Sequence, residues 1–125
     1  MRALILTLIA LSVLPLVACT KRTRPPGDVG TCYHVQPLKG GAVRYNPLGS
    51  AQPDLEHCAA ALEAMRIKFI SMGGGQLEIY GAYQGNFIFI QREGIFTAPS
   101  LEDHRYLALV RTGDGRLAIP SAMAQ

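Results

Sequence analysis

The stretch that decides the fold is PDLEHCAAALEAMRIKFIS, residues 53–71. Its apolar side chains recur at helical spacings and form a single stripe, which consists of Leu55, Cys58, Ala59, Leu62, Met65 and Phe69. Pro53 suits the first turn of a helix, where its missing N–H removes no hydrogen bond. Acidic residues lie near the start and basic residues near the end, as the helix dipole favours. The sequence therefore predicts one amphipathic helix over residues 53–71, ended by the three glycines at 73–75.

Runs of β-forming residues lie on both sides of this helix. Before it, residues 31–36 (TCYHVQ) favour a short strand, and residues 37–52 favour a loop with a brief strand at residues 42–45. After it, turn residues separate four runs that predict an antiparallel meander, residues 76–84, 87–91, 106–111 and 116–120. Residues 95–98 are a further run that extends a strand. The run FIFIQ is apolar at four successive positions, so we expect a central strand that is buried on both faces.

This order of elements predicts an α+β fold of the type β-α-β-β-β-β. A single helix would pack on a three- to five-stranded antiparallel sheet, giving two layers. A chain of 125 residues is one domain at most. We assign the domain to residues 31–120 and a C-terminal tail to residues 121–125.

The first eighteen residues have the layout of an export signal. Arg2 is their one charge, and the apolar run over residues 3–18 is shorter than the roughly 20 residues that a membrane span needs. Leu16-Val17-Ala18-Cys19 resembles the lipobox of bacterial lipoprotein precursors. The resemblance implies that residues 1–18 are removed and that Cys19 receives two or three acyl chains, palmitate among them, which anchor it in membrane lipid. An ordinary signal peptide and an uncleaved anchor are the alternatives, and Leu16 is bulky for an Ala-x-Ala cleavage site.

The lipoprotein resemblance also predicts an address. Thr20, rather than Asp, follows the lipidated cysteine, which by the family rule implies the outer membrane, facing the periplasm. Residues 19–30 are rich in Pro, Gly and basic residues, and we expect a lipidated N-terminus followed by a flexible tether. Lys21, Arg22 and Arg24 either contact acidic head groups or are simply solvated.

Lipidation of Cys19 leaves two cysteines, Cys32 and Cys58, in an oxidising compartment. An even pair in that setting predicts a disulfide, which would join the first strand to the helix. A zinc site that also uses His34 and His57 is the alternative. Neighbours on a helix point about 100° apart, so His57 and Cys58 do not easily share one ion. We therefore expect no metal site and no cofactor.

Catalytic residues do not converge in the sequence. A bridged cysteine is no nucleophile, and no nucleophile-elbow, zinc-protease or phosphate-loop motif occurs. Glu102-Asp103-His104 could supply an acid and a base, but neighbouring residues of this kind in a loop are more often a solvated turn. We expect the protein not to be an enzyme.

A protein partner is the remaining expectation. The chain from Cys19 onward carries eleven Lys and Arg against nine Asp and Glu, a balance of +2 that is too small to indicate nucleic acid. The aromatic residues Tyr80, Tyr83, Phe87 and Phe89 are candidates for an exposed partner-binding sheet face. The alternative is a second cover over that face, from residues 37–52 or from the tail.

Two functions follow from these expectations. The first is a non-catalytic envelope lipoprotein that binds another protein as an accessory or structural subunit of secretion, pilus or envelope machinery. The second is a periplasmic inhibitor or ligand-binding module, acting on a lytic enzyme, a cell-wall fragment or a small molecule. An exposed apolar face would favour the first, and a concave polar site the second.

Overall fold

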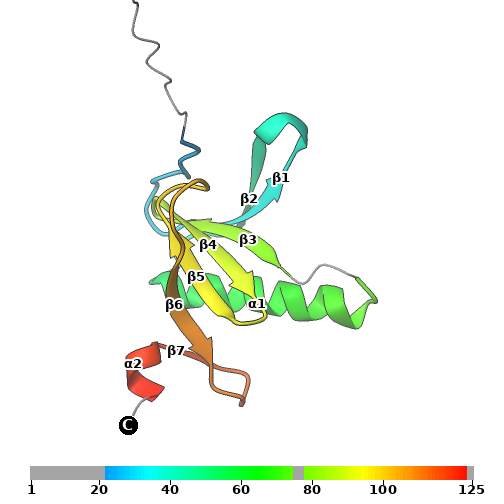
Figure 1. The fold of residues 1–125 in the computed structure, drawn as a ribbon, viewed down its shortest axis with the longest axis vertical. Coiled ribbons are helices and arrows are strands. Elements are labelled where there is room, and N and C mark those ends of the chain that lie inside the picture. The colour runs from blue at the N-terminus through cyan, green and yellow to red at the C-terminus, as the bar shows by residue number, and fades with distance from the viewer. Residues whose placement is uncertain (1–21, 75–77, 124–125) are drawn as a thin grey trace, which may run out of the picture.

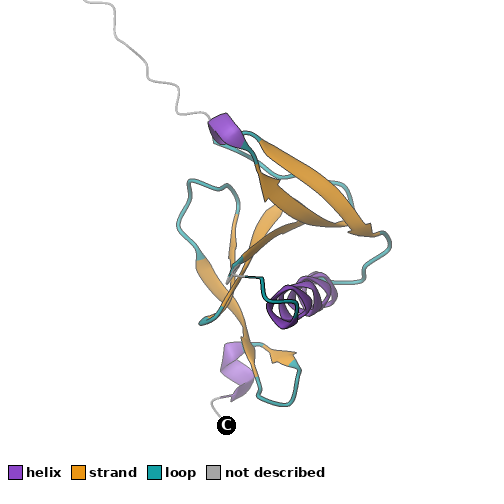
Figure 2. Ribbon diagram, turned by 90° about the vertical axis from the view of Figure 1, so that its right-hand side faces the viewer, coloured by secondary structure: helices purple, strands orange, loops and turns teal. Residues whose placement is uncertain are grey.

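The computed structural model describes residues 22–74 and 78–123 of the chain. Within them, seven strands form one antiparallel sheet in the order β2-β1-β3-β4-β5-β6-β7, and a long helix lies across one face (Figures 1 and 2). The elements are β1 (Cys32–Pro37), the 3-10 turn η1 (Lys39–Gly41), β2 (Val43–Gly49), α1 (Leu55–Ser71), β3 (Ile79–Tyr83), β4 (Asn86–Gln91), β5 (Gly94–Ala98), β6 (Tyr106–Arg111), β7 (Leu117–Ala118) and α2 (Pro120–Met123).

The predicted helix is present as α1, and it begins at Leu55, two residues later than expected. Asp54 is its N-cap, because the Asp54 side chain accepts a hydrogen bond of 2.8 Å from the backbone N–H of His57. At the other end, Gly73 adopts a positive φ of 82° and the N–H of Gly74 bonds the carbonyl of Phe69 at 2.8 Å. These caps satisfy backbone groups that a helix leaves free at its ends.

The predicted disulfide is confirmed. Cys32 on β1 and Cys58 on α1 are bonded, with their Cα atoms 5.3 Å apart. The two residues are 1% and 0% exposed, so the bond lies inside the layer between helix and sheet. It joins the two elements that the sequence pattern indicated.

The prediction of an α+β fold is confirmed, but the expected count of three to five strands is too low. The largest difference is β2, where seven residues form a strand in a region that we expected to be mostly loop. Pro47 lies within β2, and proline is disfavoured in central strands because it lacks an N–H donor. β2 is an edge strand, which is where a sheet tolerates proline.

Two apolar clusters lie on opposite faces of the sheet. The first fills the space under α1 and includes Leu62, Ile88 and Ile90. The second lies on the other face and includes Val35, Phe87 and Phe89. The side chains of β4 alternate between these clusters, and Phe87, Ile88, Phe89 and Ile90 are all 0% exposed. β4 is therefore the central, doubly buried strand that its sequence predicted.

Both ends of the domain are more ordered than expected. Residues 120–123 form the short helix α2, which extends into the region 121–125 that we expected to be a tail. Residues 22–28, expected to belong to a flexible tether, instead contact the domain through hydrogen bonds to three separate parts of it. We call residues 22–28 the N-terminal segment. The two ends lie at opposite poles of the long axis (Figure 1).

Candidate functional site

The four aromatic residues predicted to form a partner-binding face do not lie together on an exposed surface. Phe87 and Phe89 are 0% exposed in the second cluster, and Tyr80 is half-buried beside them. Tyr83 is 4% exposed and belongs to the first cluster, on the helix side. The expectation of one open aromatic face is therefore corrected, because these side chains project from both sides of the sheet and most of them are covered.

The cover over Phe87 and Phe89 comes from two directions. Tyr45 of β2 stacks on Phe87 with ring centroids 6.3 Å apart, so residues 37–52 supply part of the cover, as the alternative prediction proposed. The guanidinium of Arg105 lies 3.8 Å from the Phe89 ring centroid and forms an ion pair of 2.7 Å with Glu78. This cation–π contact closes the other side of the face. A groove of about 200 Å³ remains between the two covers, lined by Val35, Pro37, Val43, Tyr80, Leu101 and Arg105.

A wider and more polar hollow lies at the start of α1. Its volume is about 440 Å³, and it is lined by Pro53, Asp54, Leu55, Tyr83, Gln84, Asn86 and Thr97. Several of its polar groups already have partners within the chain. The Asp54 carboxylate lies 2.7 Å from the ring Nδ1 of His57, and the hydrogen bonds from His57 hold the pKa of Asp54 below its ordinary value. The side chain of Gln84 accepts a hydrogen bond of 2.9 Å from the N–H of Gly30.

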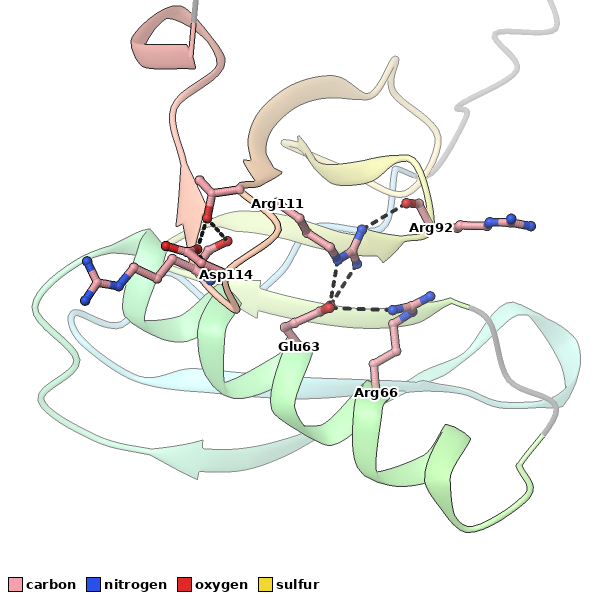
Figure 3. Close-up of polar contacts among 7 residues, drawn as sticks. Glu63, Arg66, Arg92, Arg111 and Asp114 are labelled. Carbon is pink, nitrogen blue, oxygen red and sulfur yellow. Dashed lines mark hydrogen bonds and ion pairs between the residues drawn. The ribbon is translucent and has the colours of Figure 1, made fainter.

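Charged side chains join α1 to β6 (Figure 3). Arg111 of β6 binds both carboxylate oxygens of Glu63, at 2.7 and 2.8 Å, and donates a third bond to the carbonyl of Arg92 at 3.0 Å. Arg66 lies 3.5 Å from the same carboxylate. Hydrogen bonding to Glu63 raises the pKa of Arg111, so its charge is secure at any physiological pH. This cluster fixes the position of α1 on the sheet.

A third groove, of about 240 Å³, lies next to this charge cluster. It is lined by Glu63, Ile67, Arg111, Gly113, Gly115, Arg116 and Leu117, which come from α1 and from the hairpin between β6 and β7. In the hairpin turn between β6 and β7, the Asp114 carboxylate accepts bonds from the Thr112 hydroxyl and the Arg116 N–H (Figure 3). The hairpin therefore forms a defined wall for the groove.

The end of α1 beside this groove carries an exposed apolar patch. Ile67 is 56% exposed, Ile70 41% and Met72 66%. All three lie at the C-terminal end of α1, where Met72 is the C-cap residue. Residues three apart on a helix are neighbours on its surface, so Ile67 and Ile70 are adjacent. We call these three residues the helix-end patch. The pattern of α1 pointed to its buried stripe, and the exposed patch lies outside that stripe.

The histidines are not gathered into one site. His34 lies on β1, where burial lowers its pKa, and His57 lies in the first turn of α1. His104 meets Tyr106 edge to face, with ring centroids 5.0 Å apart. Across residues 22–74 and 78–123, no group of three or more His, Cys, Asp or Glu side chains is placed to hold a metal ion. In the same ranges, no helix has both the length and the apolar character of a membrane span.

The lipobox and the predicted lipidation site, Cys19, lie outside the described residues. Comparison of the chain with protein-family models, with curated proteins and with solved structures finds no match.

Proposed function

We propose that this protein is a non-catalytic lipoprotein of the bacterial envelope that binds another protein, as an accessory or structural subunit of a periplasmic or outer-membrane assembly. The lipobox-like residues 16–19 support the lipid anchor and the address. The buried bond between Cys32 and Cys58 is of the kind that persists in an oxidising compartment such as the periplasm.

One observation carries the protein-binding part of the proposal, and it is the helix-end patch. Isolated apolar side chains on a surface are ordinary, but neighbouring large ones beside a groove are typical of protein-binding sites. Ile67 both belongs to the patch and lines the groove, where Leu117 lies half-buried on the opposite wall. Arg111 and Glu63 border the groove and already satisfy each other, while the exposed Arg116 lies on the hairpin wall.

A photo-crosslinking amino acid at Ile67, in the full-length chain expressed in its own envelope, tests this proposal. We expect a discrete crosslinked species of higher mass that mass spectrometry identifies as a second protein. The matched control places the same amino acid at Ala61, an exposed position on the same helix outside the patch. Crosslinked species that are equally abundant from Ala61, or monomers alone from Ile67, would exclude this surface as the partner site.

The lipid anchor has an independent test. Cys19→Ala should leave a precursor that keeps residues 1–18 and carries no acyl chain, because the modification needs the thiol of Cys19. Mass spectrometry of the natural chain and of this variant measures both properties. Normal cleavage of the variant would refute the lipobox interpretation.

The second candidate function, a ligand-binding or inhibitory module, is favoured by the hollow at the start of α1. Its volume of about 440 Å³ lies in the range of small-molecule sites, and Asp54, Gln84 and Asn86 give it a polar lining. Asn86→Leu tests it against the first proposal. If a ligand binds there, this variant loses binding of cell-wall fragments while crosslinking from Ile67 is unchanged.

A further inference from the structure

The N-terminal segment is attached to the domain by contacts that begin at its first residues. The Arg22 guanidinium forms an ion pair of 2.9 Å with Asp103. Both the backbone N–H and the hydroxyl of Thr23 donate to the carboxylate of Glu102, at 2.8 and 2.9 Å. The carbonyl of Thr23 in turn accepts a bond of 3.2 Å from the N–H of Leu101. These reciprocal contacts fix the segment against residues 101–103.

The attachment continues along the segment. The carbonyl of Arg24 accepts a bond of 3.2 Å from the Tyr45 hydroxyl on β2, and the carbonyl of Pro26 accepts one of 3.0 Å from the N–H of Gly85, in the turn between β3 and β4. Pro25 is buried. Two consecutive prolines restrict the free chain, which lowers the conformational entropy lost when the segment docks. The segment therefore behaves as part of the domain.

Docking at Thr23 shortens the link between domain and anchor. Three residue steps separate Cys19 from Arg22, and a chain spans at most about 3.6 Å per residue, so the two Cα atoms lie no more than about 11 Å apart. A tether that stayed free as far as residue 30 would reach about 40 Å over its eleven steps. The geometry points to a domain held directly against the membrane surface in one orientation. This inference rests on the proposed lipidation of Cys19.

The orientation follows from what lies near the docked segment. η1, at the tip of the β1–β2 hairpin, lies at the same pole as the start of the N-terminal segment, while β7 and α2 lie at the opposite pole (Figures 1 and 2). The membrane-facing pole carries the exposed basic side chains of Arg24 and Lys39, and Arg22 there is paired with Asp103. The chain at Arg22 lies within about 11 Å of Cys19, near one Debye length, and basic side chains this close to a bilayer are attracted to anionic head groups. The partner of this pole is thus the lipid surface that holds the anchor.

Amide hydrogen exchange on the full-length lipidated chain tests the docking itself. We expect the N–H groups of Leu101 and Gly85 to exchange slowly, because each bonds a carbonyl of the segment. Glu102→Ala removes the acceptor for two bonds from Thr23 and should speed exchange at both amides about tenfold. Glu93→Ala, an exposed acid in the turn between β4 and β5, is the control and should change neither rate.

Unprotected Leu101 and Gly85 amides in the natural chain, beside protected amides in β4, would overturn the docking. Because Glu102→Ala also alters the loop that it belongs to, Thr23→Val is the second variant. It removes the hydroxyl bond from the other side, and it should raise both exchange rates in the same direction.

Fluorescence quenching in vesicles tests the orientation. The lipidated chain is reconstituted into phosphatidylethanolamine–phosphatidylglycerol vesicles that contain a quencher attached to the head groups. A fluorescent amino acid at Lys39 should be quenched several-fold more than one at Ser121, which is exposed on α2 at the far pole. Inserting ten Gly and Ser residues between Lys21 and Arg22 adds a link of about 17 Å and should remove this difference.

The outcomes separate this inference from the proposed function. A chain that carries no acyl group by mass spectrometry and does not float with vesicles would defeat the lipoprotein proposal, whatever its exchange rates. A lipidated chain with equal quenching at Lys39 and Ser121 would leave that proposal intact and overturn the fixed orientation.

Discussion

At the scale of single residues, Gly81 shows how closely α1 approaches the sheet. A Cβ atom added there would lie 2.2 Å from a methyl carbon of Leu62 and 3.0 Å from the carbonyl oxygen of Tyr33. Leu62 is 0% exposed, so its methyl group would have to shift within the core to make room. The absence of a side chain at position 81 is therefore what lets helix and sheet pack together.

We expect Gly81→Ala to lower the free energy of unfolding by about 1–3 kcal/mol, the usual cost of overpacking a core. Urea denaturation measures it. Gly27→Ala is the matched control, because an added Cβ there has nothing within 4 Å, and it should change stability by less than about 0.5 kcal/mol. Equal effects at the two positions would contradict the packing assignment.

The disulfide gives a second prediction at this scale. Cys32 and Cys58 are 26 residues apart, and closing a loop of that length stabilises a fold by about 3.5 kcal/mol in the chain-entropy model. The double variant Cys32→Ala/Cys58→Ala should lose about that amount in urea denaturation under non-reducing conditions. A loss below about 1 kcal/mol would show that the bond does little to restrict the unfolded chain.

At the scale of elements, Arg111 and Glu63 join β6 to α1. Arg111 uses the planar fork of its guanidinium to meet both carboxylate oxygens while a third N–H bonds the carbonyl of Arg92. Lysine keeps the positive charge but has no such fork. The side chains are only 27% and 12% exposed, so the geometry of the pair contributes to how α1 is held.

Arg111→Lys should therefore lower the free energy of unfolding by about 1 kcal/mol, since it loses bonds but not charge. Arg44→Lys on β2 is the control, because Arg44 is exposed and the change should have an effect within about 0.5 kcal/mol. Thermal and urea unfolding of the two variants give the comparison. Unchanged stability in Arg111→Lys would mean that charge alone positions the helix.

At the scale of the whole molecule, we expect attachment of the N-terminal segment to depend on pH. The backbone N–H of Thr23 holds the pKa of Glu102 below its ordinary value of 4.5. A carboxyl with a lowered pKa in the docked state contributes its full effect above the ordinary value and loses it as the pH falls through the lowered one. The ion pair between Arg22 and Asp103 lies beside the same contact.

We expect the segment to keep its full attachment from neutral pH down to about 4.5 and to be held less tightly at lower pH, as Glu102 takes up a proton. The NMR shift of the Thr23 amide, followed against pH, should titrate with that lowered pKa. Glu102→Gln should abolish the titration. An amide shift that does not change over this range would show that Glu102 is not the group that holds the segment.

Much of the helix-side architecture was predictable because local pattern encodes it. Spacing along the chain identifies the apolar stripe of α1 and the doubly apolar run of β4, and counting identifies the pair Cys32 and Cys58. The brief strand expected at residues 42–45 overlaps the start of β2, but the rest of β2 was missed. Pro47 argues against a strand unless the strand is known to lie at an edge, and edge position belongs to the assembled sheet. The helix-end patch was missed for a related reason, because the exposure of Ile67 depends on whether another part of the folded chain covers it.

The sequence by itself determined the fold class, the main helix, the central strand and the pairing of Cys32 with Cys58. Only the tertiary structure decided which side chains cover Phe87 and Phe89, how many strands complete the sheet and whether residues 22–28 are free. These outcomes depend on contacts between distant parts of the chain, such as the bond from Thr23 to Glu102 across 79 positions. Periodicity reports which face of an element is buried, but it does not specify which distant segment covers that face.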